Sequence, residues 1–262
     1  MRGYVGAEGA QVHFRASGEQ GHTLVLFHES PQASNVFEPA LPALGATLRV
    51  FAFDTPGYGM SDPPARPLEI PDYAARLLAA IDALGIESFA VAGQHTGASI
   101  ALEVARLAGR RVTHAVLSGL VLLDPAQRQE FLASWAPDGQ VQPDGSHLQT
   151  LWRKYVGLWE EPTELVHLAV SNIASVYERY NWAYNAAFRH DPAPALAEVE
   201  CPVLLLTAER DMLAHLDERA LQLRPDAQQV RLTHGTGQLP WRVPEEFAAV
   251  VTDFLARPAV SR

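Results

Sequence analysis

The sequence predicts an α/β fold, in which a mostly parallel sheet is covered by helices on both faces. Short apolar runs that are typical of buried strands alternate with segments of helical periodicity. The chain has 262 residues and 48% of them are hydrophobic, which is enough for one large core. Residues 125–199 break the alternation, because they contain no strand-like run and carry four of the five tryptophans. They therefore predict a helical insertion.

The predicted strands follow one another along the chain with turns or helices between them. Residues 11–15 alternate as a short strand, whereas 23–28 and 49–53 are continuous apolar runs of the buried type. Later runs predict further strands at 88–92, in the first part of 112–123, at 202–207 and at 229–232.

Three segments have the spacing of helices. Residues 72–84 place apolar side chains on one face and end before Gly85, which is suited to a C-cap. Residues 97–107 form a helix of small side chains, and 244–255 begin with a proline in the first turn. The sequence thus predicts a core at 1–124 and 200–262, with a helical cap at 125–199. Reactive groups are expected beyond the carboxyl ends of the parallel strands.

Composition and charge exclude several classes of protein. The formal net charge is −10 with only 20 Lys and Arg, which disfavours binding to nucleic acid. No apolar run approaches the length of a membrane span, and the first residues lack the pattern of a secretory signal. The single cysteine, Cys201, excludes an internal disulfide. We expect a cytoplasmic protein with a small-molecule substrate and no membrane partner, and a homodimer stays open.

The segment Gly93-Gln94-His95-Thr96-Gly97 follows a predicted strand and opens a predicted helix. This is the setting of the nucleophile elbow G-x-S-x-G, in which two glycines permit a sharp turn with a strained central residue. The sequence therefore predicts that His95 has an unusual φ and projects at the edge of the sheet. A histidine stands where the motif has serine.

Four further motifs accompany the elbow in sequence order, and together they resemble the α/β-hydrolase family over nearly the whole chain. They are similar to the family's HG-x-P turn, its D-x-P-G-x-G-x-S-D loop, the position of its triad acid and its G-H-x-P…P-E-E-F segment. The corresponding residues are His28–Pro31, Asp54–Asp62, Glu209–Asp211, and Gly237–Pro240 followed by Pro244–Phe247. The resemblance implies that fold, and it implies that His95, Asp211 and Gln238 occupy the triad positions.

Three active positions depart from the family's pattern. His95 replaces the serine, and Gln238 replaces the histidine that acts as base, so ordinary serine-esterase chemistry is excluded. Glu29 replaces a glycine in the oxyanion turn, where an inward carboxylate would oppose negative charge on a substrate oxygen. A hydrogen bond from His95 to Glu29 would raise the imidazole pKa and fix its tautomer.

Two hypotheses follow for the function. The first is an enzyme without a cofactor that acts on a small, partly apolar carbonyl compound, by hydrolysis or by a lyase or isomerase step begun by proton abstraction. In it, His95 is base or nucleophile, Glu29 or Asp211 orients it, and Gln238 donates a hydrogen bond to the substrate or to Asp211. The alternative is a pseudoenzyme or binding protein that keeps the pocket without the chemistry.

Other residues near these motifs are candidates for lesser roles. Those expected to contact the substrate are His28, Gln94, Thr96, Trp182 and Tyr184. His234 is a candidate substitute base, although surface exposure is the simpler interpretation, and Asp124 is more typical of a helix N-cap. Ser99 is expected to bond within its helix. Metal binding by His28, Glu29 and His95 is not expected, and no glycine-rich nucleotide motif is present.

Overall fold

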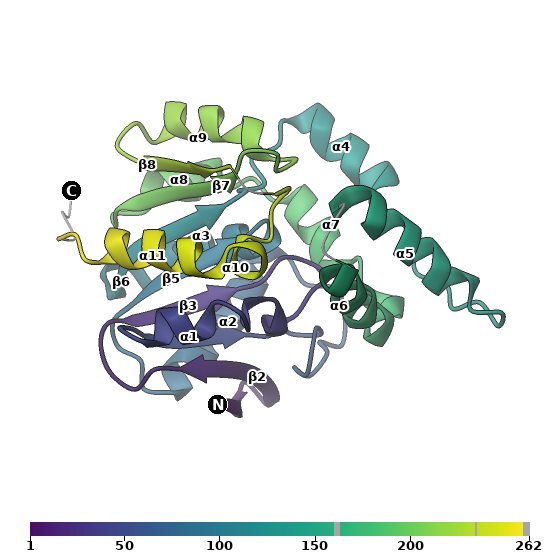
Figure 1. Cartoon of the computed structure of the whole chain (residues 1–262), viewed down its shortest axis with the longest axis horizontal. Helices are drawn as coiled ribbons and strands as arrows, with labels where there is room; N and C mark the ends of the chain where they lie inside the picture. Colours follow the sequence, from purple (N-terminus) through teal and green to yellow (C-terminus); the bar gives the residue numbers. More distant parts are fainter. Residues whose placement is uncertain (160–162, 234, 259–262) are drawn as a thin grey trace.

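A computed structural model describes residues 1–159, 163–233 and 235–258, and they form one eight-stranded sheet with helices on both faces (Figure 1). The strand order is β1-β2-β4-β3-β5-β6-β7-β8, with β2 antiparallel to both neighbours and β4 onward parallel. The strands are β1 (Arg2–Ala7), β2 (Ala10–Ser17), β3 (Thr23–Phe27), β4 (Arg49–Phe53), β5 (Phe89–Gln94), β6 (Val112–Ser118), β7 (Val203–Ala208) and β8 (Gln228–Leu232).

From β3 to β8 the α-helices alternate with the strands, except between β6 and β7, where the described residues form five in succession, and two more follow β8. They are α1 (Leu41–Gly45), α2 (Ile70–Ala83), α3 (Thr96–Ala108), α4 (Pro125–Ser134), α5 (Ser146–Trp159), α6 (Thr163–Ser175), α7 (Trp182–Arg189), α8 (Ala193–Glu198), α9 (Asp217–Leu223), α10 (Leu239–Arg242) and α11 (Pro244–Leu255). Short 3₁₀ turns occupy Ser34–Phe37, Gly109–Arg111, Tyr177–Arg179 and Ala214–Leu216.

The central strands are buried on both faces, and this explains their uninterrupted apolar sequences. In β3, Val25 and Phe27 pack with α2 and α3, whereas Leu24 and Leu26 pack on the opposite face with α1 and α11. Successive side chains of a strand point to opposite faces, so a strand between two helical layers is apolar at every position. The predicted α/β fold is confirmed.

The sequence predictions missed the edge of the sheet and several short helices. Strand β1 pairs with β2 as a hairpin, but only one of its six residues is buried, so it lacks a buried apolar run. The helices α1, α9 and α10 have at most seven residues, which is too short for a clear apolar periodicity. The helices predicted at 72–84, 97–107 and 244–255 correspond to α2, α3 and α11.

The helices α4 to α7 project beyond the sheet, on the right in Figure 1, at the carboxyl ends of the parallel strands. The loop after β4 contacts this insertion directly. The Tyr58 hydroxyl accepts a hydrogen bond from Ala183 N at 2.8 Å and lies 3.2 Å from Tyr180 O, and Arg179 Nε donates to Gly57 O at 2.8 Å. These buried bonds position the insertion over the strand ends.

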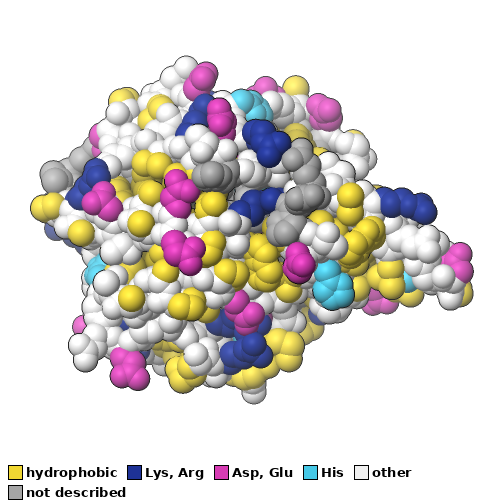
Figure 2. Space-filling view, in the orientation of Figure 1, with side chains coloured by type: hydrophobic (Ala, Val, Ile, Leu, Met, Phe, Trp, Pro, Cys, Tyr) yellow, Lys and Arg dark blue, Asp and Glu magenta, His cyan; other side chains and the backbone are white. Residues whose placement is uncertain are grey.

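The surface carries both signs of charge. In the face shown in Figure 2, the described Lys and Arg side chains are scattered among Asp and Glu rather than gathered into one basic area. Over the described ranges 1–159, 163–233 and 235–258, no helix combines the length and the apolarity that crossing a membrane requires.

Candidate active site

His95 lies at the turn between β5 and α3, with φ 46° and ψ −110°. This positive φ confirms the predicted elbow. The two glycines are required by close packing of the backbone. A Cβ at Gly93 would lie 2.0 Å from Gly97 O, and one at Gly97 would lie 2.1 Å from Phe27 O. The strained turn therefore projects the imidazole past the ends of the strands.

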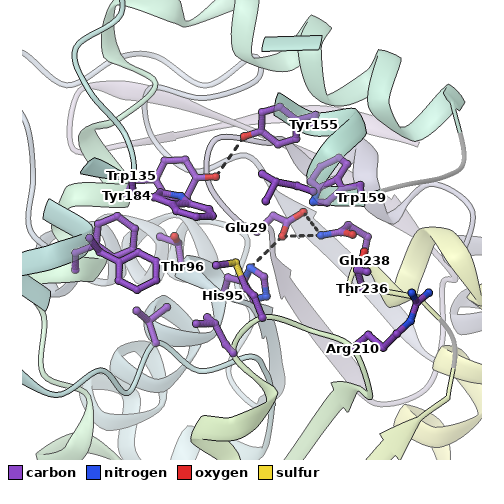
Figure 3. A pocket seen from close by; sticks show the side chains of 16 residues that line it. Glu29, His95, Thr96, Trp135, Tyr155, Trp159, Tyr184, Arg210, Thr236 and Gln238 are labelled. Carbon is purple, nitrogen blue, oxygen red and sulfur yellow. Dashed lines mark hydrogen bonds and ion pairs between the residues drawn. The ribbon is translucent and has the colours of Figure 1, made fainter. Parts of the chain in front are cut away.

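The imidazole of His95 lies between two carboxylates. Its Nε2 is 2.8 Å from Oδ2 of Asp211, which follows β7, and its Nδ1 is 3.3 Å from Oε2 of Glu29, which follows β3. Figure 3 shows Glu29 between His95 and Gln238. Three parallel strands thus bring these residues together, although Asp211 is 116 positions from His95 in sequence.

The two carboxylates hold His95 in its protonated form. Burial by itself lowers the pKa of the imidazole, but the charge and hydrogen bond of Asp211 and the charge of Glu29 raise the pKa to about 9. At neutral pH both ring nitrogens therefore carry protons; Nε2 donates a hydrogen bond to Asp211, and Nδ1 forms an ion pair with Glu29. An imidazolium has no free lone pair, so this arrangement disfavours the expected role of His95 as base or nucleophile.

Glu29 is the carboxylate of this cluster that lines the cavity. Burial raises its pKa, while His95 and the amide of Gln238 partly oppose that rise. Gln238 Nε2 lies 3.3 Å from both Glu29 oxygens, whereas the sequence led us to expect a bond to Asp211 or to the substrate. Gln238 also has a left-handed backbone, with φ 50° and ψ 40°, as the N-cap of α10.

A cavity of about 110 Å³ opens over His95 and is mostly apolar. An enclosed cavity of about 150 Å³ holds benzene, so this one suits a ring or a short chain of similar size. The insertion supplies its aromatic lining, namely Phe131, Trp135, Tyr155, Trp159, Tyr184 and Phe188. Glu29, His95, Thr96 and Gln238 line it from the core, while Asp211 lies buried behind His95.

The other residues proposed to contact a substrate lie outside this lining. Both ring nitrogens of His28 have backbone partners, because Nδ1 donates to Glu29 O at 2.8 Å and Nε2 accepts from Thr55 N at 2.9 Å. This leaves neither nitrogen for a metal. Gln94 is buried at the end of β5, and Trp182 begins α7 without reaching the cavity. His234 lies outside the described residues.

Two lesser candidates lie away from the cavity. Asp124 caps α4, where its carboxylate accepts from Gln127 N at 2.9 Å, as its position before a proline favours. The expected hydrogen bond of Ser99 within its helix is wrong, because its hydroxyl is buried in α3 without a partner among the described residues. Ser99 does not line the cavity either.

The loop 54–62 holds the oxyanion turn in place. The Asp54 carboxylate accepts from Ser34 N at 2.6 Å, from Met60 N at 2.9 Å and from His13 Nδ1 at 2.8 Å. Burial would raise its pKa, but the hydrogen bonds from His13, Ser34 and Met60 lower the pKa to about 2. Thr55 N in turn donates to the ring of His28, which directly precedes Glu29. The loop therefore helps to fix the backbone from which the Glu29 side chain projects.

Sequence reasoning missed several residues of the cavity. The aromatic content of 125–199 indicated a pocket, but not which rings face it, because the helices had not been placed individually. Gly119, with φ +61°, also has no sequence signal, although a Cβ there would lie 2.4 Å from Cδ2 of His95. Arg210 and Thr236 complete the rim from the loops after β7 and β8.

Curated relatives include two enzymes of Pseudomonas putida. The chain is 27% identical to 2-hydroxy-6-oxononadienedioate/2-hydroxy-6-oxononatrienedioate hydrolase 2, over 94% of this chain and 91% of that protein. It is 25% identical to N-formylmaleamate deformylase, over 98% of this chain and 97% of that one. Both relatives are hydrolases that act on small substrates, and they match almost end to end.

Solved structures share the whole fold. E-2-(acetamidomethylene)succinate hydrolase superposes with a TM-score of 0.82 at 21% identity, over 98% of this chain and 99% of that chain. The enol-lactonase from Burkholderia xenovorans LB400 gives 0.80 at 18% identity, over 97% of this chain and 100% of that chain. The family model of the alpha/beta hydrolase fold matches residues 22–234. With the elbow, the sheet order and the insertion in place, the chain belongs to the alpha/beta hydrolase fold family.

Proposed function

We propose that the protein is an enzyme that acts on a small, partly apolar carbonyl compound by proton transfer at the cluster of Glu29, His95 and Asp211. The observation that carries the proposal is the imidazolium held between two carboxylates at the elbow, beneath a cavity lined by aromatic side chains. Groups with strongly shifted pKa values in an apolar pocket are typical of catalytic sites.

Glu29 is the proton acceptor in this proposal. A carboxylate that is removed from water becomes a stronger base, and its burial raises the pKa of Glu29 in that sense. It can take a proton from a water that attacks a carbonyl, which gives hydrolysis, or from carbon beside the carbonyl, which begins a lyase or isomerase step. In both reactions the only protein group that accepts a proton is Glu29, which lines the cavity.

His95 and Asp211 position this base and balance its charge. The imidazolium donates a hydrogen bond to Asp211 through Nε2 and forms an ion pair with Glu29 at Nδ1, so its charge lies directly beside the carboxylate that lines the cavity. His95 therefore takes the central place of a non-standard triad without acting as nucleophile. Gln238 fixes Glu29 from its other side.

The relatives support the substrate class. Their names specify an oxo acid and a formyl amide, both of which contain carbonyl groups, and both enzymes are hydrolases. The apolar cavity of about 110 Å³ favours a compound whose reacting part is no larger than a single ring.

The test is turnover of a panel of small lactones, enol esters, N-formyl amides and 1,3-diketones by the purified protein. For a compound that is turned over, Glu29→Gln should lower kcat by at least ~100-fold with little change in ligand affinity, because a positioned base acts in the transition state. His167→Ala, an exposed histidine in α6, is the matched control and should keep parental activity.

Dependence on pH gives a second readout. The rate should rise as the Glu29 carboxyl loses its proton, above the usual range for glutamic acid, and fall as His95 deprotonates near its pKa of about 9. Parental turnover by Glu29→Gln would contradict the proposal. Binding of compounds from the panel without turnover of any would favour the pseudoenzyme alternative.

A further inference from the structure

Two tyrosines of the insertion place hydroxyl groups in the roof of the cavity. Tyr155 comes from α5 and Tyr184 from α7, and their hydroxyl oxygens lie 3.3 Å apart. The indole of Trp135 lies beside the Tyr184 hydroxyl and also lines the cavity. Figure 3 shows the Tyr155–Tyr184 pair facing the part of the cavity that holds Glu29.

One hydroxyl proton of this tyrosine pair is left without an acceptor. The pair has two hydroxyl protons, and the bond between the oxygens uses one of them, whichever tyrosine donates. The Trp135 N–H can only donate, so it accepts neither proton. Among the described residues, the other hydroxyl proton has no acceptor. Burial raises the pKa of both phenols, so both stay protonated at neutral pH.

The floor of the cavity carries a hydrogen-bond acceptor with negative charge, whereas the roof offers a hydrogen-bond donor. In the oxyanion turn after β3 stands Glu29, whose carboxylate cannot stabilise negative charge on a substrate oxygen beside it. A reaction that begins with proton removal by Glu29 nevertheless creates such charge on the carbonyl oxygen. The tyrosine pair lines the same cavity as Glu29, so its remaining hydroxyl proton is available to donate a hydrogen bond to that charged oxygen.

We propose that the Tyr155–Tyr184 pair is the oxyanion donor of this enzyme, and that the substrate is a carbonyl compound with an acidic C–H next to the carbonyl. This rests on the proposed function of Glu29 as base. The C–H bond breaks, its proton goes to Glu29, and its electron pair forms an enolate whose oxygen accepts the hydroxyl proton as a hydrogen bond. A carboxylate base facing a tyrosine donor is a workable pairing for such chemistry.

Binding of 4-nitrophenolate tests the donor without turnover. This ring-sized oxyanion absorbs visible light, and Glu29→Gln should bind it more tightly than the parent, because the neutral amide resembles the protonated base. In that background, changing both Tyr155→Phe and Tyr184→Phe should weaken binding about 10- to 100-fold, as expected for a hydrogen bond to a charged oxygen. Tyr177→Phe, a cap tyrosine outside the cavity lining, is the control and should leave affinity unchanged.

Nitrobenzene, the neutral analogue, separates the hydrogen bond from packing. Its affinity should change by less than about 2-fold in the double variant, since two phenylalanines keep the ring contacts. An equal loss for both probes would overturn the proposal. So would failure of the Glu29→Gln protein to bind 4-nitrophenolate, or unchanged phenolate affinity in the double variant.

Deuterium exchange tests the substrate class. In D₂O the parent should catalyse exchange at the carbon beside the carbonyl of phenylacetone, followed by NMR, and Glu29→Gln and the double tyrosine variant should both slow it. Lack of exchange by the parent would overturn the carbon-acid class. If turnover of the carbonyl panel depended on Glu29 but not on the tyrosines, the proposed function would stand and this inference would fail.

Discussion

The imidazole of His95 bonds the carboxylate of Asp211 directly, with Nε2 and Oδ2 2.8 Å apart across the strand ends of β5 and β7. In the serine triad, a histidine stands between the acid and the nucleophile. Here the residue at the nucleophile position itself contacts the acid, and Gln238 contacts Glu29 instead. The site is therefore organised around a buried charge cluster rather than a nucleophile.

Both carboxylates should contribute to the pKa of His95, and unequally. Asp211→Asn should lower the pKa more than Glu29→Gln does, because Asp211 is closer, at 2.8 Å against 3.3 Å, and also accepts a hydrogen bond from the ring. NMR titration of the His95 ring protons measures both shifts. A larger effect of Glu29→Gln would show that the order of the two contacts is wrong.

The same cluster predicts a loss of stability at alkaline pH. The pKa of His95 rises from 6.5 to about 9 on folding, so its contribution is complete below pH 6.5 and disappears as pH rises through 9. The shift corresponds to a free energy on the order of 3 kcal/mol. Urea unfolding from pH 6 to pH 10 measures it, and His95→Gln should lack this part of the alkaline decline. His167→Ala, the exposed control, should keep the parental profile.

Gly119→Ala should disturb His95 from the neighbouring strand end. The added Cβ would lie 2.4 Å from the imidazole, and the backbone at φ +61° disfavours any L side chain. We expect destabilisation of at least ~1 kcal/mol and a lower His95 pKa as the ring moves away from Asp211. Urea unfolding and NMR titration measure the two effects.

Gly157→Ala is the matched control for that substitution. Gly157 lies in α5, where the described residues outside its own helix backbone place no atom within 4 Å of the added Cβ. Alanine favours a helix over glycine by about 1 kcal/mol, so this variant should be as stable as the parent or more so. A Gly119→Ala protein that behaved in the same way would contradict the close contact with His95.

Asp54→Asn should destabilise the fold by about 2 kcal/mol, because the carboxylate pKa falls from 3.8 to about 2 on folding. This contribution is present above pH 3.8 and is lost as pH falls through 2, so the difference between parent and variant should shrink in acid. Chemical denaturation at pH 7 and pH 2 tests this. Asp253→Asn, at an exposed ion pair with Arg257, should cost less than ~0.5 kcal/mol.

Reagents that phosphorylate activated serines should leave the parent unlabelled, because position 95 has no hydroxyl and position 238 has no base. Combining His95→Ser, Gln238→His and Glu29→Gly restores the family's residue types around Asp211, and this protein should be labelled. Intact-protein mass spectrometry measures both results, with His95→Ser alone as the control. Stoichiometric labelling of the parent would reveal a serine nucleophile elsewhere.

The sequence by itself determined the fold and the positions of the elbow residues. The strands β3, β4 and β5 have apolar residues at nearly every position between their ends because both faces are buried, and that pattern is local. The strained turn at His95 also follows from local requirements, since only glycine fits at positions 93 and 97. Such features can be predicted without knowing what lies across the fold.

Only the tertiary structure decided the chemistry of the site. His95 lies between Glu29 and Asp211, and its pKa depends on the distances to both, which no sequence spacing encodes. The same holds for Gln238, which bonds Glu29 rather than Asp211. The Tyr155–Tyr184 pair likewise joins two helices whose faces are fixed by packing of the insertion on the strand ends. Electrostatic interactions depend on distance and burial, and those are set when distant segments meet.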